Sequence, residues 1–276
     1  MLRRLIDHLF GRRKRRRADI LATPFPDAWL PYLRRAVPSY ECLSPEDQLR
    51  VQDAVKLFIA EKSFLGCRGV VIDDEIKVIV AGAACLLLLG LPHLDVFPRL
   101  REIIIYPHDL REEIDAIGPD GRRYYIERLR AGEAWRRGPV VLAWNNVAHS
   151  IAGPRDGYNV VLHEFAHVID LQNGDADGVP PLPTREQHSR WIEVMRFEFE
   201  QFVKENRRGE MTFIDPYAAT DMAEFFAVST EHFYEQPRQM RDSHPDLYEL
   251  FVDFFGRDPT TWRRAEPSRW QPRTLR

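Results

Sequence analysis

The chain has 276 residues, of which 44% are hydrophobic and 29% charged, and its formal net charge at pH 7 is −3. This composition is ordinary for a soluble globular protein with a large core, and it gives no overall reason to expect nucleic acid as a partner. The three cysteines, Cys42, Cys67 and Cys85, are few, odd in number and not at the spacing of a zinc ribbon. We therefore expect reduced thiols and a cytoplasmic location. The longest apolar run, residues 78–91, is too short to span a bilayer.

The N-terminus combines an apolar stripe with a basic run. Leu2, Leu5, Ile6 and Leu9 recur at helical spacing and precede the sequence GRRKRRR. Such a segment suits a membrane-surface helix or a nucleic-acid arm. A solvated basic tail is the simpler interpretation, and we assign residues 1–20 to a mobile tail.

Two helices are predicted after this segment. Ser44 is placed as an N-cap with Pro45 at the first helical position, which is typical of a helix start. Asp73 or Asp74 starts the second helix, and Gly90 is expected to end it. Their apolar positions indicate that both helices belong to the hydrophobic core, and neither helix shows a pattern of catalytic residues.

Two strands are predicted before the central motif. REIIIY, at residues 101–106, indicates a buried strand, and VVLAW, at residues 140–144, indicates a second one. Between them, residues 108–137 are polar, with a turn at residues 118–121. The exposed edge of VVLAW would suit an extended peptide, and a plain core strand is the equal alternative.

The central motif is VVLHEFAHVID, residues 160–170, for which Asn159 is a plausible N-cap. His163 and His167 are four residues apart, so on a helix both imidazoles lie on one face and reach one zinc ion. Glu164 between them is placed to reach a zinc-bound water. The flanking residues are almost all apolar, and a metal explains why three titratable groups lie in so apolar a helix.

Ordinary core histidines are the alternative, because a pattern this short also arises by chance. The long metzincin signature fails here, since Asp170 and Asn173 occupy the positions that require Gly and His. The third ligand must therefore come from a later segment.

Glu224 is the best candidate for that third ligand. It lies in the apolar sequence AEFFAV, where a carboxylate needs a partner. The alternative is a capping box, with Asp221 as N-cap and Glu224 at N3. The candidates that we compared are His188, Glu193, Glu198, Glu224, Glu231 and His232.

Two further acids are candidates for orienting a ligand histidine. Glu231 lies further along the same segment, and an ordinary salt bridge is its preferred interpretation. Asp170 lies three residues after His167 and either orients it, caps the helix or faces solvent. The loop at residues 175–183 lacks the acid spacing of an EF-hand.

Several blocks resemble the Mlc titration factor A family of zinc metallopeptidases. They occur in order from about residue 43 to residue 255 and read ACLLLLGL, IIIYP, GEAW-RRGPVVLAW, GYNVVLHEFAHVIDLQNGDADGVP and IDPYAATDMAEFFAV. So many ordered blocks are far more specific than the short motif alone. The basic tail is not a feature of this family.

The resemblance implies a zincin whose active site is related to the gluzincins and to anthrax lethal factor. It implies zinc ligands at His163, His167 and Glu224, a general base at Glu164 and an active-site tyrosine at Tyr217. Family members are associated with aminopeptidase-like activity on small peptides, and enterobacterial members bind the glucose-responsive repressor Mlc. Nothing in this sequence indicates such a repressor in its host.

The expected fold is α+β, mainly helical, with a small sheet beside the motif helix. We expect one peptidase domain at residues 21–258, with an N-terminal helical half at 21–135, a catalytic half at 136–258 and a polar tail at 259–276. The expected reaction is peptide hydrolysis by a zinc-activated water whose proton passes to Glu164. The alternative is a regulatory protein that sequesters a transcriptional repressor and has latent peptidase activity.

Overall fold

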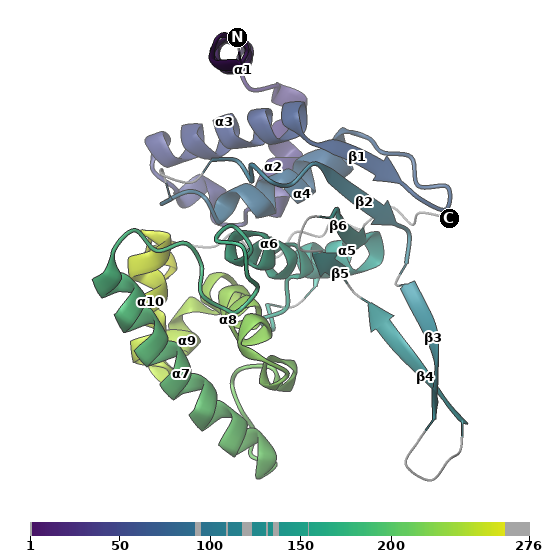
Figure 1. Ribbon diagram of the computed structural model, residues 1–276, viewed down its shortest axis with the longest axis vertical. Helices are drawn as coiled ribbons and strands as arrows, with labels where there is room; N and C mark the ends of the chain where they lie inside the picture. Colours follow the sequence, from purple (N-terminus) through teal and green to yellow (C-terminus); the bar gives the residue numbers. More distant parts are fainter. Residues whose placement is uncertain are drawn as a thin grey trace.

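The computed structural model describes the backbone at residues 2–91, 95–108, 110–117, 123–130, 132–134, 138–153 and 155–262. Within it, side chains are described at residues 11–91, 95–108, 138–153 and 155–262. The protein is mainly helical and carries a small sheet, so the predicted α+β class is confirmed (Figure 1). The division into a domain and two tails stays a prediction, and residues 263–276 lie outside the described part.

The elements follow one another without internal repetition. The helices are α1 (Leu2–Ala22), α2 (Leu30–Ala36), α3 (Pro45–Glu61), α4 (Asp74–Leu86), α5 (Trp144–Ala152), α6 (Val160–Asp170), α7 (Arg185–Arg207), α8 (Met222–Glu235), α9 (Pro237–Ser243) and α10 (Pro245–Phe255). The strands are β1 (Ser63–Gly66), β2 (Glu102–Tyr106), β3 (Leu110–Ile117), β4 (Arg123–Arg130), β5 (Gly132–Ala134) and β6 (Val140–Ala143). Four short 3-10 helices join them, η1 (Asp27–Trp29), η2 (Tyr40–Cys42), η3 (Pro216–Ala219) and η4 (Pro259–Thr261).

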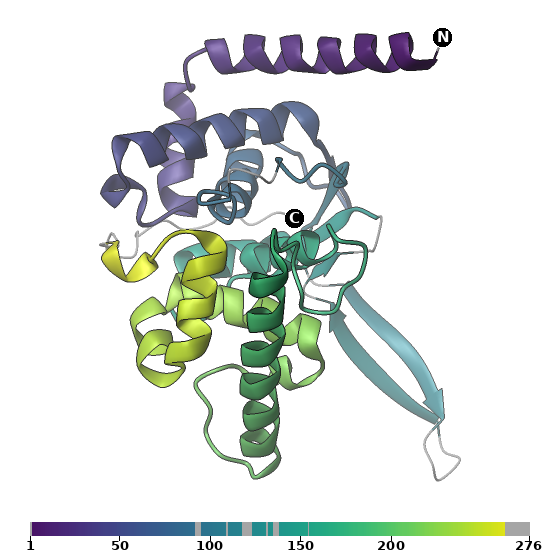
Figure 2. The ribbon, with the colours of Figure 1, turned by 60° about the vertical axis from the view of Figure 1, so that its left-hand side comes forward.

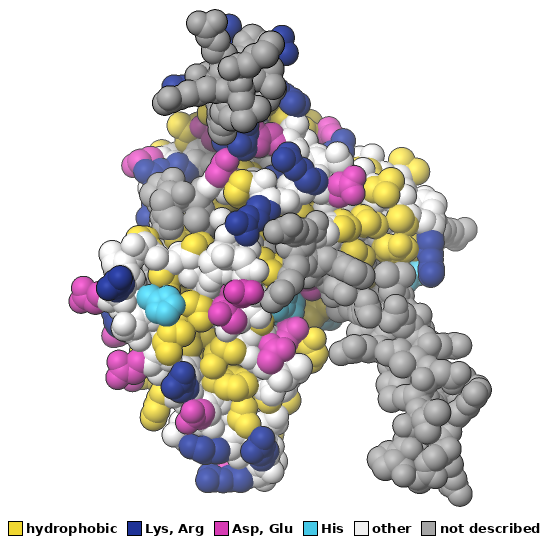
Figure 3. Space-filling model, viewed as in Figure 1, with side chains coloured by type: hydrophobic (Ala, Val, Ile, Leu, Met, Phe, Trp, Pro, Cys, Tyr) yellow, Lys and Arg dark blue, Asp and Glu magenta, His cyan; other side chains and the backbone are white. Residues whose placement is uncertain are grey.

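The basic N-terminal segment is helical and lies across the outer side of α3 (Figure 2). The Arg17 guanidinium contacts Glu61 Oε2 at 2.7 Å and Asp95 Oδ1 at 2.6 Å, and Arg13 also pairs with both carboxylates. Basic side chains surround this end of the molecule in Figure 3. Of the helices that the structure describes, none is both long and apolar enough to cross a membrane.

Both predicted helix starts are confirmed. Ser44 accepts a hydrogen bond from the amide of Asp47, and Asp73 accepts one from the amide of Ile76. The predicted end of α4 is wrong, because the helix ends at Leu86, before Gly90. Gly90 instead allows close backbone packing, since a Cβ atom there would lie 2.0 Å from the carbonyl oxygen of Phe255.

The larger sheet has the strand order β1-β2-β6-β5, in which β1, β2 and β6 are parallel and β5 is antiparallel to β6. The predicted strand VVLAW forms β6, except that its last residue, Trp144, begins α5. Because β6 pairs on both sides, the core-strand alternative is confirmed and the exposed-edge alternative is wrong. The edge strand beside α6 is β5.

The polar stretch between the two predicted strands contains a hairpin that the sequence analysis missed. β3 pairs antiparallel with β4 over their full lengths, and the ribbon extends away from the sheet (Figure 1). Its sequences, LREEIDAI and RYYIERLR, are rich in charge and lack a continuous apolar face, so the pattern for a half-buried strand is weak. The turn predicted at residues 118–121 lies outside the described residues.

Helix α6 is the centre of the fold, between the N-terminal helices and the C-terminal ones (Figures 1 and 2). Phe165 projects from α6 toward the N-terminal half, with its ring centroid 5.6 Å from Phe58 of α3 and 4.8 Å from Phe97. On the other side, α6 packs against α8. A second aromatic cluster around Trp191 joins α7, α8 and α10 through Phe226, Phe251 and Phe254. The first cluster joins α6 to the N-terminal half, and the second joins α8, on which α6 packs, to α7 and α10.

Candidate metal centre

The motif forms helix α6 as predicted, and Asn159 is its N-cap. The Asn159 side chain accepts a hydrogen bond from the amide of Leu162, and the Ser150 hydroxyl accepts one from the amide of Val160. Most residues of α6 are buried. His163 and His167 face the same side of the helix, with ring centroids 4.9 Å apart.

Helix α8 places Glu224 against this histidine pair. Its Oε2 atom lies 3.1 Å from Nε2 of His163 and 3.4 Å from Nε2 of His167, while the two Nε2 atoms are 3.3 Å apart. The structure therefore brings together the three side chains that the sequence analysis selected as ligands. Among the described residues, they are the one group of His, Cys, Asp and Glu whose spacing could hold a metal ion.

The geometry of this triangle fits a divalent metal. Ligand atoms about 2.0–2.1 Å from one tetrahedral centre lie about 3.3 Å apart, and the three distances agree with that value. Oε2 of Glu224 is buried and has no hydrogen bond of standard geometry within the described part of the chain. A buried carboxylate oxygen in this condition is costly unless another positive partner is supplied. Two histidines and one glutamate form a ligand set typical of catalytic zinc.

Behind the triangle, the other ring nitrogen of His163 faces Glu231. Nδ1 of His163 lies 2.8 Å from Oε1 of Glu231, and the other oxygen of this carboxylate accepts the backbone N–H of Asn159. Glu231 is only 3% exposed. Glu231 therefore contacts a predicted ligand histidine, and the same contact is a salt bridge when His163 is protonated. The carboxylate favours the His163 tautomer that carries its proton on Nδ1 and leaves Nε2 as an acceptor.

Burial and neighbouring charges shift the pKa values of His163 and Glu224 in opposite directions. Burial lowers the pKa of His163, but the close contacts with the carboxylates of Glu224 and Glu231 outweigh it and raise that pKa well above its usual value. Burial raises the pKa of Glu224, and the close contacts with His163 and His167 more than reverse this, so its pKa lies well below its usual value. Both shifts favour a protonated His163 imidazole facing an ionised Glu224 carboxylate.

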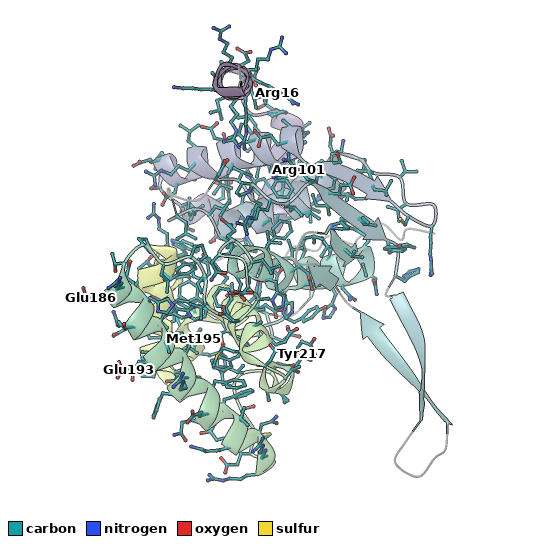
Figure 4. All side chains as sticks on the ribbon, viewed as in Figure 1. Arg16, Arg101, Glu186, Glu193, Met195 and Tyr217 are labelled. Atoms are coloured by element: carbon teal, nitrogen blue, oxygen red, sulfur yellow. The ribbon has the colours of Figure 1, made fainter. Side chains whose placement is uncertain are left out.

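Tyr217 lies in the turn before α8, where Figure 4 labels it. Its hydroxyl donates a hydrogen bond to Oε1 of Glu224 at 3.3 Å, and its ring centroid is 6.2 Å from that of His163. The backbone amide of Tyr217 is held by the Asp215 side chain. At 55% exposed, Tyr217 combines a solvent-facing ring with a hydroxyl at the edge of the triangle.

Glu164 follows His163 on α6 and is 3% exposed, while Asp170 at the end of α6 is completely buried. Asp170 accepts the backbone N–H of Gly178 at 2.8 Å, so it holds the loop after α6 instead of facing solvent. Burial is the main reason why the pKa of Asp170 is raised to about 7.

The remaining candidates for the third ligand lie elsewhere. His188 and Glu193 are exposed on α7, and Figure 4 shows Glu193 on the outer side of that helix. Glu198 pairs with His244, and the ring of His232 packs 4.6 Å from that of Phe213.

The sequence analysis missed a polar chain beside the site. The Asn159 side-chain amide donates to Glu235 Oε1 at 2.9 Å, and the other oxygen of Glu235 pairs with Arg155 at 2.7 Å. One signal was present in the sequence, because Glu231 and Glu235 are four residues apart and therefore share a face of α8. Nothing local indicated that Asn159 and Arg155 face them.

Comparisons with known proteins find relatives over most of the chain. The profile of the family described as glucose-regulated metallo-peptidase M90 matches residues 11–256. The match includes the basic run at residues 11–17, so the expectation that this run lies outside the family is wrong. The chain is 36% identical over 248 residues to the uncharacterized protein slr2042 of Synechocystis sp., covering 88% of this chain and 89% of the relative. It is also 32% identical over 232 residues to Mlc titration factor A of Escherichia coli, covering 81% and 84%, and 32% identical over 238 residues to Mlc titration factor A of Escherichia fergusonii, covering 84% and 88%. The chain therefore belongs to the glucose-regulated metallo-peptidase M90 family.

Proposed function

We propose that this protein is a zinc-dependent peptidase with its metal bound by His163, His167 and Glu224. The triangle of two Nε2 atoms and one carboxylate oxygen, 3.1–3.4 Å apart, is the observation that carries this proposal. The ligand set distinguishes zinc from calcium or magnesium, which prefer oxygen ligands alone. Three protein ligands leave a fourth position open for water or substrate.

Glu164 is the proposed general base. A zinc ion in this site would supply Lewis acidity, which polarises a peptide carbonyl and lowers the pKa of a water molecule toward about 7. The Glu164 carboxylate would accept the proton of the attacking water and later deliver it to the leaving amine. Its position on α6, directly after His163, and its burial support this role.

Tyr217 is the proposed donor to the oxygen that becomes negative during the reaction. Its hydroxyl reaches the edge of the ligand triangle while its ring remains accessible to solvent. A hydroxyl on this short, well-held turn can donate to a developing oxyanion without a large rearrangement.

The outer edge of β5 is the proposed place for the substrate backbone. β5 pairs with β6 on one side and packs against α6, and no described strand pairs with its other side. An extended peptide that adds to this edge would form main-chain hydrogen bonds beside the histidine pair. A preference for small peptides and for their N-termini, as in an aminopeptidase, rests on the family resemblance.

The test compares the wild-type protein with Glu164→Gln. We expect the wild type to bind about one zinc ion per chain, measured by mass spectrometry of the metal, and to cleave a panel of short peptides. Glu164→Gln should keep its zinc and lose turnover, because the amide cannot accept the proton. Glu193→Gln, an exposed change on α7, is the matched control and should change neither quantity. Full activity in Glu164→Gln would refute the proposed base.

A regulatory role remains a separate prediction. The relatives carry the name Mlc titration factor A, so a transcriptional repressor is one protein partner to test. A pull-down with the repressor, using wild type and the Glu164→Gln and Glu224→Ala variants, separates the two roles. Equal capture by all three would show that binding is independent of an intact site. A cytoplasmic location also stays a prediction.

A further inference from the structure

The loop before α6 is fastened to the far end of α8, the same helix that carries Glu224 near its start. Arg155 pairs with Glu235, and its backbone oxygen accepts a hydrogen bond from Gln236 at 2.9 Å. Gly157, with φ of +97°, brings the backbone so close to His232 that a Cβ atom would lie 2.2 Å from the ring. The start of α6 and the end of α8 are therefore joined at several points.

From Arg155, the polar contacts continue without a break to His163. One carboxylate oxygen of Glu235 accepts a hydrogen bond from the Arg155 guanidinium, and the other accepts one from the Asn159 side-chain amide. The backbone N–H of Asn159 then donates to Glu231, whose second oxygen faces His163 Nδ1. Each carboxylate in this chain uses both of its oxygens, and both carboxylates are at least nine-tenths buried.

We propose that Arg155 is a positioning residue for the metal site, because the chain Arg155–Glu235–Asn159–Glu231 holds His163 in its ligating orientation and tautomer. This inference rests on the proposed metal site. Arg155 pairs with Glu235, and its guanidinium offsets the negative charge of that buried carboxylate. Glu235 holds the Asn159 side chain, and Asn159 in turn presents the N–H that keeps Glu231 pointed at the ring.

This series of hydrogen bonds predicts which substitutions weaken zinc binding most. Partners that hold a ligand histidine from behind typically change metal affinity by about 10–100-fold when removed. We therefore expect Glu231→Gln to raise the zinc dissociation constant by at least about tenfold. A residue further along a coupled network has a smaller effect, and Arg155→Met should raise it by roughly twofold to thirtyfold. Arg155→Lys keeps the charge and should recover most of the loss.

The experiment measures zinc affinity by competition with a chromophoric chelator, for wild type, Arg155→Met, Arg155→Lys, Glu231→Gln and the double variant Arg155→Met/Glu231→Gln. Arg190→Met is the control, because Arg190 makes an exposed ion pair with Asp253 on a different part of the surface. Thermal unfolding of the metal-free proteins shows that each variant is folded. The NMR signal of the proton on His163 Nδ1 reports the tautomer directly.

The double variant decides whether Arg155 acts through Glu231. If it does, the double variant binds zinc as weakly as Glu231→Gln alone, within about twofold, because the route is already broken. The inference would be overturned if the fold-increases in the zinc dissociation constant of the two single variants multiplied in the double variant. It would also be overturned if Arg155→Met had wild-type zinc affinity and an unchanged Nδ1 signal. If the wild type itself bound no zinc, the proposed metal site would fall instead, so the two failures are distinguishable.

Discussion

The side chain of Asp221 accepts a hydrogen bond at 2.9 Å from the backbone N–H of Glu224, while the Glu224 carboxylate points to His163 and His167. Asp221 is therefore the N-cap of α8, as predicted. The reciprocal half of a capping box is absent at this helix, whereas α7 has both halves between Thr184 and Gln187. The two interpretations of this segment are compatible, because the backbone N–H of Glu224 is bound by the cap while its side chain faces the two histidines.

Because the backbone and the side chain of Glu224 have different partners, substitutions at Glu224 and Asp221 should differ in their effects on zinc content and on stability. Glu224→Gln should lose zinc, because a neutral amide is a much weaker ligand than a carboxylate. Asp221→Ala should keep most of its zinc and lose about 1 kcal/mol of unfolding free energy, the usual value of an N-cap. Metal analysis and urea unfolding measure the two quantities. Full zinc occupancy in Glu224→Gln would restrict Glu224 to a structural role.

A second prediction concerns the Tyr217 hydroxyl. Tyr217→Phe removes one donor at the edge of the triangle and leaves the three ligands in place. We expect zinc content to be unchanged and kcat to fall by roughly 10²–10³, with little change in KM, because the lost interaction belongs to the transition state. Tyr158→Phe is the control, since Tyr158 is also partly exposed and its ring faces His149. Equal kinetics in Tyr217→Phe and wild type would contradict the assignment.

A third prediction concerns the pH dependence of stability. The pKa of Asp170 is raised from 3.8 to about 7, mainly by burial, so the folded state binds this proton more tightly than the unfolded state does. The associated stability is present below about pH 4 and is lost as pH rises through 7. At about 1.4 kcal/mol for each pKa unit, the loss is on the order of 4 kcal/mol.

Asp170→Asn removes this titration and keeps an acceptor for the amide of Gly178. The unfolding free energy of the variant, relative to metal-free wild type, should therefore rise between pH 4 and pH 8. Urea unfolding at several pH values measures it, and the exposed change Asp242→Asn serves as the flat control. A difference that does not vary with pH would contradict the prediction.

A fourth prediction uses two glycines with nearly the same backbone angle. Gly178 has φ of +75° and Gly209 has φ of +71°, so an alanine at either position pays about 1–2 kcal/mol for the left-handed conformation. At Gly178 a Cβ atom would also lie 2.4 Å from the carbonyl oxygen of Met222, whereas nothing lies within 4 Å at Gly209. Gly178→Ala should therefore be more destabilising than Gly209→Ala by about 1–3 kcal/mol in urea unfolding.

The two glycine substitutions should also differ in their effect on zinc binding. Met222 is the first residue of α8 and lies two residues before Glu224, so relief of the clash at Gly178 moves the start of that helix. We expect Gly178→Ala to weaken zinc binding and Gly209→Ala to leave it unchanged. Equal zinc affinity in the two variants would show that the start of α8 does not depend on the loop at Gly178.

Features that depend on neighbours in sequence were predicted well. Ser44, Asp73, Asn159 and Asp221 are N-caps because their side chains reach amides only a few residues further on. The spacing that places two histidines on one face of α6 is equally local.

Features that depend on packing were predicted poorly. Gly90 was predicted to end a helix. A glycine is needed there because the backbone at the end of α10 approaches closely. VVLAW was recognised as a strand, but its place inside the sheet depends on β5, whose three residues carry little pattern of their own. The β3–β4 ribbon was missed because its charged strands resemble a polar loop.

For the candidate site, the sequence alone singled out the side chains that we propose for the chemistry: two histidines one helical turn apart, a glutamate between them and a carboxylate in a later apolar segment. Only the tertiary structure decided how these parts are held. The contact between His163 and Glu231 spans 68 residues, and that between Arg155 and Glu235 spans 80. No local pattern encodes contacts of this range, because they form only when α6 packs against α8.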